Sequence, residues 1–485
     1  MMSRFTGAFY LGPAVLILLW SLGCATNPVT GKKELSLISE AQEIAMGREA
    51  DQQITASMGL YRDQGLQDYV HDLGMKLAKT SERPNLPWSF KVIDDPAVNA
   101  FALPGGFIYV TRGILAHLNS EAELAAVLGH EIGHVTAKHG VNRMSKSQLF
   151  GLGLGIGSVL KPGLQRFGDL AQQGLGLLFL KFSRADERQS DDLGFRYSIN
   201  GGYDPRQMPE VFKVLKAVGE SAGVGRVPNW LATHPDPVDR RERIEAKIRA
   251  APDDFHGLKV ERSSYLRRLD NIVFGPNPRD GFFEENVFYQ PEMRFRLNFP
   301  AGWKTKNQGD AVLGVSGESD GVVQLKLVEE TDPQAVVEKF ISQDGVESGG
   351  VRAVRVNGIP GAWAEFSVRS EAVNVDGLIY SVRYEGNSYA LLGYSQSDKW
   401  SSYSTTIGNS IRSFAPLTDR AKLDVQPARV DIVRSNRRLS LDAFQKQYPS
   451  SVPLGTVGLI NHIGSRGYFE TGTDYKRIVG GTNRP

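Results

Sequence analysis

One short segment limits what this chain can fold into more than any other. Residues 130–134 read His-Glu-Ile-Gly-His, and side chains four residues apart lie on the same face of an α-helix, one turn above each other. A helix is expected here for independent reasons, because Ser120 and Glu123 match a capping box and apolar residues follow at helical spacing. Both imidazoles can then reach one metal ion, with Glu131 rotated by about 100° and lying beside the ion. The segment therefore predicts a metal-binding helix that ends at Gly140, a natural stop.

The amino-acid composition limits the kinds of metal site that the chain can form. The chain of 485 residues has a single cysteine, Cys24, which excludes an intramolecular disulfide and a multi-cysteine zinc site. Its eight histidines are the remaining soft ligands. Lysine and arginine exceed aspartate and glutamate by 56 − 54 = 2, so the charge gives no case for a nucleic-acid partner. The length predicts about two to four domains.

A catalytic zinc ion holds three protein ligands and leaves one position open, so a third ligand is needed. The position six residues past the second histidine is Gly140, and His139 falls one residue early, where we expect it at the surface. A later helix is expected to open within residues 183–191, whose Ser-x-x-Asp start matches a capping box. On it Glu187 can bind the metal, while Asp191 can accept the second ring N–H of a ligand histidine. The helix dipole favours such acidic residues even without a metal.

Four segments carry a family resemblance. They occur in the order 99–106 (Asn-Ala-Phe-Ala-Leu-Pro-Gly-Gly), 130–134, 183–191 and 233–235 (Thr-His-Pro). Together they resemble the CAAX-prenyl-endopeptidase-like (HtpX/BepA/LoiP-like) zinc metallopeptidases, a gluzincin family, and in particular its periplasmic lipoprotein branch. The resemblance covers roughly residues 24–250. At positions 189 and 190, Gln-Ser replaces the commoner Glu-Ala, a change that we expect to leave the metal ligands untouched.

The resemblance implies a fold and a chemistry. The fold is α+β, with a mainly helical gluzincin-type metallopeptidase domain that contains a small sheet. One zinc ion per chain is expected on His130, His134 and Glu187, with Glu131 as the catalytic base. The implied activity is endoproteolysis of proteins in the cell envelope.

His234 and Arg240 are further candidates for the site. In some relatives a loop histidine gives the zinc a fourth ligand, and such a ligand displaces the water and keeps the enzyme latent until the loop moves. Alternatively, His234 stabilises the oxyanion of the reaction together with Arg240, or it only caps a helix.

Residues 107–111 alternate as a strand ahead of the metal-binding helix. In gluzincin folds such an edge strand binds the substrate as an added strand, through main-chain hydrogen bonds that ignore sequence. A core strand is the alternative. The residues predicted to contact substrate in this way are Phe107, Ile108, Tyr109 and Val110.

The amino terminus predicts a lipoprotein signal peptide over residues 1–23. The apolar run from Phe9 to Leu22 has signal-peptide length and is short for a membrane span. Residues 21–24, Ser-Leu-Gly-Cys, resemble a bacterial lipobox, which makes Cys24 the lipidated residue and the membrane anchor. Ser21 stands where a larger residue is usual, and a plain secretory signal is the alternative. Ala25 after the cysteine implies, by resemblance to enteric sorting rules, the outer membrane and a periplasmic orientation.

The chain is expected to have a peptidase domain at 24–260, which three further parts follow. Residues 149–180 within that domain, rich in Gly and Leu, are expected to form a buried or mobile helical hairpin, or else a lid or a segment that dips into lipid. Residues 261–285 are predicted as a linker, and 286–417 as an α+β domain with an antiparallel sheet, faintly similar to PsbP-like domains. Residues 424–485 resemble a degenerate LysM module, which would bind peptidoglycan, or form a small packing subdomain.

These observations lead to one main hypothesis and two alternatives. The main one is a zinc-dependent endopeptidase of the bacterial envelope that cleaves misfolded or stalled proteins. The first alternative is a chaperone-like assembly factor whose metal site is largely plugged, and the second is a cell-wall tether. The expected partners are unfolded or misassembled envelope proteins, the membrane through Cys24, and either peptidoglycan or the outer-membrane assembly machinery.

Overall fold

The computed structural model describes residues 24–145, 181–221, 234, 237–252, 254–309, 311–370 and 374–481. The predicted signal peptide at 1–23 and the predicted hairpin at 149–180 lie outside these residues. The described residues form two compact units, one running to residue 275 with 429–479 added, and one comprising mainly 276–428. Helices and antiparallel strands occur in both, which confirms the α+β class. No helix among the described ranges combines the length and hydropathy that crossing a membrane requires.

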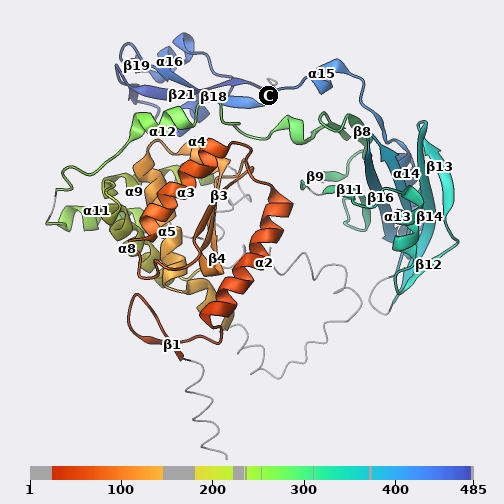
Figure 1. Ribbon diagram of the computed structural model, residues 1–485. Helices are drawn as coiled ribbons and strands as arrows, with labels where there is room; N and C mark the ends of the chain where they lie inside the picture. The colour runs from red at the N-terminus through yellow and green to blue at the C-terminus, as the bar shows by residue number, and fades with distance from the viewer. Residues whose placement is uncertain are drawn as a thin grey trace, which may run out of the picture. The chain divides into compact units, whose positions relative to one another are not determined.

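The first unit is mainly helical and contains a three-stranded sheet (Figure 1). The helices are α2 (Glu40–Met58), α3 (Gln64–Ala78), α4 (Arg112–His117), α5 (Glu121–Thr136), α8 (Arg184–Asn200), α9 (Met208–Ser221), α11 (Pro237–Ala250) and α12 (Arg262–Arg268). The strands are β3 (Ser89–Ile93), β4 (Ala100–Leu103) and β5 (Phe107–Thr111), with a separate short hairpin of β1 (Cys24–Thr26) and β2 (Lys33–Leu35).

Strand β5 is the centre of its sheet, not an edge. The strand order is β3-β5-β4, with β5 parallel to β3 and antiparallel to β4. Both sides of its main chain are therefore bonded within the protein, and all five of its residues are buried. The prediction that Phe107, Ile108, Tyr109 and Val110 bind a substrate strand is wrong, because a paired strand has no free N–H or C=O groups to offer.

The C-terminal segment contributes residues 429–479 to the first unit. Strand β18 pairs with β21, and β19 pairs with β20. Inside this module the Phe444 and Phe469 rings stack with centroids 3.8 Å apart. Binding of glycan strands by this segment stays a prediction. Its elements are β18 (Ala428–Arg434), β19 (Leu439–Ser440), α16 (Leu441–Gln447), α17 (Leu454–Ile460), β20 (Tyr468–Phe469) and β21 (Asp474–Gly480).

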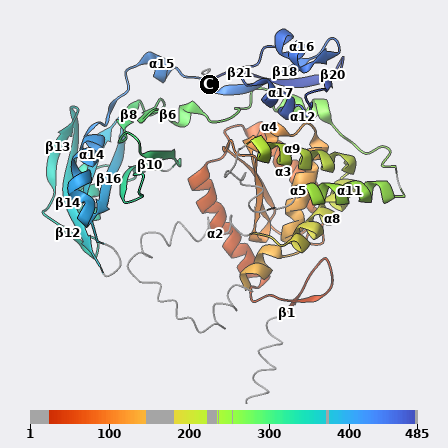
Figure 2. The ribbon, with the colours of Figure 1, turned by 180° about the vertical axis from the view of Figure 1, so that it is seen from behind.

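Buried polar contacts join this module to α4. Lys476 is 0% exposed, and its Nζ donates to the main-chain oxygens of Ala116 at 2.8 Å and Leu118 at 2.7 Å. His462 Nε2 lies 2.9 Å from the main-chain oxygen of His117. These carbonyls belong to the end of a helix, where they lack helical partners. Figure 1 and Figure 2 both show the module beside α4 and α12. The module therefore supplies hydrogen-bond donors to the carbonyl groups at the end of α4.

Mild acid is expected to weaken this attachment. Burial lowers the pKa of His117 to about 4, and burial together with the Lys476 charge lowers the pKa of His462 to about 3. Both rings are neutral when folded, whereas an unfolded histidine gains a proton below about pH 6.5. The stability that they give is therefore intact above that pH and is lost as the pH falls toward 4. Melting temperatures measured between about pH 7.5 and about pH 4.5 test this.

His462→Gln is the matched control for the acid experiment. The glutamine amide can keep an N–H donor near the position of Nε2, but it has no proton to gain. Its melting temperature should fall less with pH than that of the unchanged protein. An identical pH dependence in the two proteins would contradict the expectation.

The second unit is built on antiparallel sheets. An eight-stranded sheet has the order β12-β14-β15-β16-β11-β10-β9, with β13 also paired to β14, and a four-stranded sheet has the order β17-β8-β7-β6. Side chains alternate between faces, so α13 packs on one face of the large sheet, against Ala364 and Ile379, and α14 packs on the other, against Tyr380 and Leu391. The helices are α13 (Pro333–Ile341), α14 (Trp400–Arg412) and α15 (Arg420–Leu423), and the strands are β6 (Phe282–Glu284), β7 (Val287–Gln290), β8 (Phe295–Asn298), β9 (Lys304–Asn307), β10 (Ala311–Val315), β11 (Gly321–Val328), β12 (Val346–Ser348), β13 (Arg352–Val356), β14 (Ile359–Arg369), β15 (Asn374–Tyr384), β16 (Asn387–Gln396) and β17 (Ala415–Pro416).

Candidate metal centre

Helix α5 carries the first two candidate ligands and begins at its predicted cap. The Ser120 hydroxyl accepts the N–H of Glu123 at 3.2 Å, and the Glu123 carboxylate accepts the N–H of Asn119 at 2.8 Å. The carboxylate thus reaches one residue further back than a standard capping box requires. The helix ends at Thr136, four residues before the predicted stop, because a turn follows in which Lys138 has a left-handed φ of 59°.

Helix α8 lies unusually close to α5. A Cβ atom placed on Gly194 of α8 would be 2.9 Å from the main-chain nitrogen of His130. One placed on Gly133 of α5 would be 3.1 Å from a Cα atom of α8. Glycine at both positions removes the atoms that would hold the two backbones apart. The carboxylates in the first two turns of α8 therefore come within reach of the histidines on α5.

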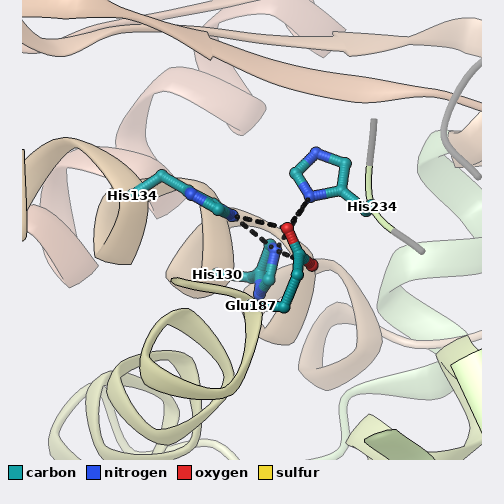
Figure 3. Close-up of side chains that lie close together, drawn as sticks. All are labelled: His130, His134, Glu187 and His234. Carbon is teal, nitrogen blue, oxygen red and sulfur yellow. Dashed lines mark hydrogen bonds and ion pairs between the residues drawn. The ribbon is translucent and has the colours of Figure 1, made fainter. Parts of the chain in front are cut away.

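Four buried side chains converge at the place where these helices meet (Figure 3). His130, His134, Glu187 and His234 each offer one ligand atom, and these atoms all lie within 4.8 Å of one another. The Nε2 atoms of the first two are 3.0 Å apart. The carboxylate oxygens of Glu187 lie 3.5 Å from Nε2 of His134 and 3.6 Å from Nε2 of His130. Two imidazoles and a carboxylate are a donor set of catalytic zinc sites, so these residues fit that ion.

His234 occupies a fourth ligand position. Its Nδ1 lies 2.9 Å from Oε1 of Glu187 and 3.4 Å from Nε2 of His130. Burial acts to lower the pKa of His234, but the charges of Glu187 and Glu131 outweigh it and the pKa is raised. Burial acts to raise the pKa of the Glu187 carboxyl, but His234 and Arg240 hold it below its usual value. The ring is therefore held in the centre of the site by its carboxylates.

Glu131 lies beside the four ligands and is not one of them. It is 1% exposed, and its Oε1 is 3.8 Å from Nε2 of His234. Among the residues that the structure describes, this oxygen has no hydrogen-bond partner. Burial raises the pKa of the carboxyl. A buried carboxylate oxygen without a partner is the group that a water molecule at a metal ion would satisfy.

Asp191 and Arg240 form hydrogen bonds and ion pairs with the candidate ligands. Asp191 Oδ1 lies 3.0 Å from Nδ1 of His130, which places the proton of that ring on Nδ1 and leaves Nε2 for a metal. Arg240 donates to both oxygens of Asp191, at 2.6 and 2.9 Å, and its NH1 lies 2.8 Å from Oε2 of Glu187. Burial acts to raise the pKa of Asp191, but Arg240 and His130 hold it far below its usual value. This geometry favours a positioning role for Arg240, and its predicted role at an oxyanion stays a prediction.

His139 is 6% exposed, so its predicted surface position is wrong. The turn at Lys138 brings the chain back toward α5, and the His139 ring lies against that of His134 with centroids 5.0 Å apart. Spacing along an uninterrupted helix cannot reveal this contact, because the helix ends between the two residues.

The model of peptidase family M48 matches residues 65–248, which include all four converging side chains. The chain has an M48 peptidase domain. The match confirms the predicted peptidase family for residues 65–248, and the periplasmic lipoprotein branch stays a prediction.

Curated relatives match about half of this chain. A beta-barrel assembly-enhancing protease from Yersinia pestis is 31% identical over 226 residues, which are 44% of this chain and 45% of that protein. The protein of the same name from Escherichia coli K12 is 30% identical over 253 residues, covering 48% and 51%. The mitochondrial metalloendopeptidase OMA1 of Arabidopsis thaliana is 31% identical over 219 residues, covering 44% and 41%. The chain spans about half the length of the curated relatives that it matches.

A solved structure also matches part of the chain. The cyanobacterial PsbP of Synechocystis aligns with 28% of this chain and 94% of its own, at 14% identity and a TM-score of 0.24. The PsbP-like character of residues 286–417 stays a prediction.

Proposed function

We propose that this chain is a zinc-dependent endopeptidase of the bacterial cell envelope. The observation that carries the proposal is the buried Oε1 of Glu131, which has no hydrogen-bond partner among the described residues and lies beside a converging group of two imidazoles and a carboxylate. A purely structural metal site has no use for such a carboxylate, since structural zinc ions are closed by four ligands. A hydrolytic site needs it as the base that accepts a proton from water.

The chemistry is divided among few groups. A zinc ion held by His130, His134 and Glu187 would lower the pKa of water to about 7 and polarise a peptide carbonyl. Glu131 accepts the proton of the attacking water and passes it to the leaving nitrogen. Its raised pKa, caused by burial, favours holding that proton between the two steps. Asp191 keeps His130 in the tautomer that binds metal through Nε2.

The resting enzyme is proposed to be latent. The Nδ1 atom of His234 lies in a ligand position, 2.9 Å from Glu187 and 3.4 Å from the metal-facing nitrogen of His130. A ring in that position excludes the water that hydrolysis consumes, so the segment that carries it must move before turnover. The same observation supports the second candidate, a chaperone-like assembly factor whose metal site is largely plugged.

Substrate pairing is proposed for β4 in place of β5. Strand β4 pairs with β5 on one side and packs on α5. The Thr111 N–H donates to the Asn99 oxygen at 3.0 Å, and bonding alternates along an antiparallel pair. The N–H and C=O of Ala100 and Ala102 therefore point away from β5. Ala102 is partly exposed. An extended peptide bound there would be held by main-chain contacts, which suits unfolded chains of many sequences.

The location and partners are proposed from the sequence and the relatives. Cys24 as a lipidated residue would anchor the chain at the outer membrane, facing the periplasm. Two bacterial relatives are named for enhancing β-barrel assembly, which supports unfolded or misassembled envelope proteins as substrates. Binding to peptidoglycan or to the outer-membrane assembly machinery remains a further proposal.

Metal content and proteolysis measured together test the proposal. The purified chain is expected to hold about one zinc ion and to degrade unfolded casein slowly. His234→Ala is expected to keep the ion and to cleave at least about 10-fold faster, because water gains the fourth position. A chelator should abolish casein cleavage by both proteins, and added zinc should restore it. Absence of zinc from both proteins would overturn the function, whereas zinc without cleavage in either would favour the assembly factor.

A further inference from the structure

We propose that His139 is a positioning residue that fixes the metal ligand His134. The proposal rests on metal binding by His134, which belongs to the proposed function. It adds a residue that the spacing of the ligands does not suggest and that contacts no metal itself.

The contacts of His139 form a short chain that leads away from the site. Its Nδ1 lies 3.1 Å from Nδ1 of His134, the ring atom opposite the metal-facing Nε2. Its Nε2 lies 3.0 Å from Oε1 of Gln189 on α8. The Ser190 hydroxyl is 3.3 Å from Nδ1 of His139, and Asp186 Oδ1 is 3.8 Å from its Nε2. The shortest contacts are therefore the ones to His134 and Gln189.

The positions of the protons follow from these contacts. When Nε2 of His134 binds a metal, its Nδ1 carries the proton and must donate it. Nδ1 of His139 is then the acceptor, so the proton of His139 is on Nε2. That N–H donates to the amide oxygen of Gln189. His139 thus fixes the tautomer of His134, and Gln189 fixes the tautomer of His139.

The backbone explains why His139 can reach this position. Helix α5 ends at Thr136, and Lys138 adopts a left-handed φ of 59°. Lys138 Nζ lies 3.8 Å from Oε2 of the buried Glu43, which ties the turn to α2. A continuous helix would place a residue five positions on at about 140° from His134. The turn brings it back to the ring.

The two histidines of α5 are therefore held by unlike partners. His130 donates to the carboxylate of Asp191, whereas His134 donates to a neutral imidazole backed by an amide. Residues 189 and 190, where the sequence departs from the commoner Glu-Ala, make closer contacts with His139 than Asp186 does. Gln189 and Ser190 therefore affect the metal site through His139, although the metal ligands themselves are unchanged.

Three substitutions at one position test the role. His139→Leu removes the acceptor and keeps the bulk. His139→Asn can place its amide oxygen near the position of Nδ1, whereas His139→Gln places its polar group near Nε2. Zinc affinity, measured by competition with a chelator, should fall by about 10- to 100-fold in the Leu and Gln variants. The Asn variant should recover most of the loss.

A matched measurement separates positioning from folding and from the proposed function. The melting temperature of each zinc-free variant measures the stability that the substitution itself costs, and a positioning role predicts that zinc affinity follows the presence of an acceptor near Nδ1 and not the order of these melting temperatures. Equal zinc affinity in the Leu and unchanged proteins would overturn the proposal and leave the peptidase assignment standing. A loss that is the same in Leu, Gln and Asn would also overturn it, because packing alone would then explain the effect. Absence of zinc in the unchanged protein would instead refute the proposed function.

Discussion

Glu131→Gln is expected to abolish hydrolysis and to leave zinc bound. The glutamine has almost the same shape, but its amide cannot accept the proton of an attacking water. Glu131 is buried beside the ligands, and none of the four converging ligand atoms belongs to it. General base catalysis contributes about 10²- to 10⁴-fold to such reactions, so the rate should fall by that factor. The rate of casein cleavage and the zinc content of the same sample are the measurements.

The comparison is best made in a His234→Ala background, where the proposed fourth ligand is absent and the starting rate is high. Glu123→Gln is a matched control, because it makes the same change to a buried glutamate of the same helix. Its amide oxygen can still accept the N–H of Asn119. Cleavage should therefore survive in the control. Cleavage that also survives in Glu131→Gln would contradict the mechanism and favour the assembly factor.

Local sequence signals predicted the parts of this site that depend on local structure. The capping residues of α5 and α8 and the four-residue spacing of the histidines act within one helix, and the structure brings His130, His134 and Glu187 together. These three side chains meet when two helices pack side by side. The resemblance to known metallopeptidases indicated that the second of these helices is α8.

Features that depend on long-range pairing were not predictable in this way. Alternation in residues 107–111 indicates a strand, but its place in the sheet is set by partners on either side, and β5 is central. His139 is buried because of a single left-handed residue, Lys138, that no helical periodicity reveals. Lys476 contacts carbonyls 358 and 360 positions earlier in the chain, so its segment was predicted as a separate module. In each case the position of the residue depends on a feature outside the segment whose pattern gave the prediction.

Substituting Gly194 is expected to cost the protein its zinc, although this residue touches no ligand side chain. A Cβ there would lie 2.9 Å from the main-chain nitrogen of His130, and a main-chain atom cannot rotate away as a side chain can. Helix α8 must therefore shift from α5. Glu187 and Asp191 lie on the same helix, seven and three residues earlier, so they move with it. The site loses its third ligand and the partner of His130 together.

The expected size of the effect follows from both losses. Overpacking of a well-packed contact costs about 1–3 kcal/mol, so Gly194→Ala should lower the melting temperature measurably, and Gly194→Val should lower it further. The loss of zinc affinity should exceed what the loss of folding stability alone explains. A ligand displaced by a few tenths of an ångström no longer meets the narrow distances of a zinc site. Gly140→Ala is the control, since a Cβ at that position meets nothing within 4 Å. If Gly194→Val bound zinc as tightly as the control, the close approach of α5 and α8 would not be what brings Glu187 to the histidines, and the account of how this site is built would fail.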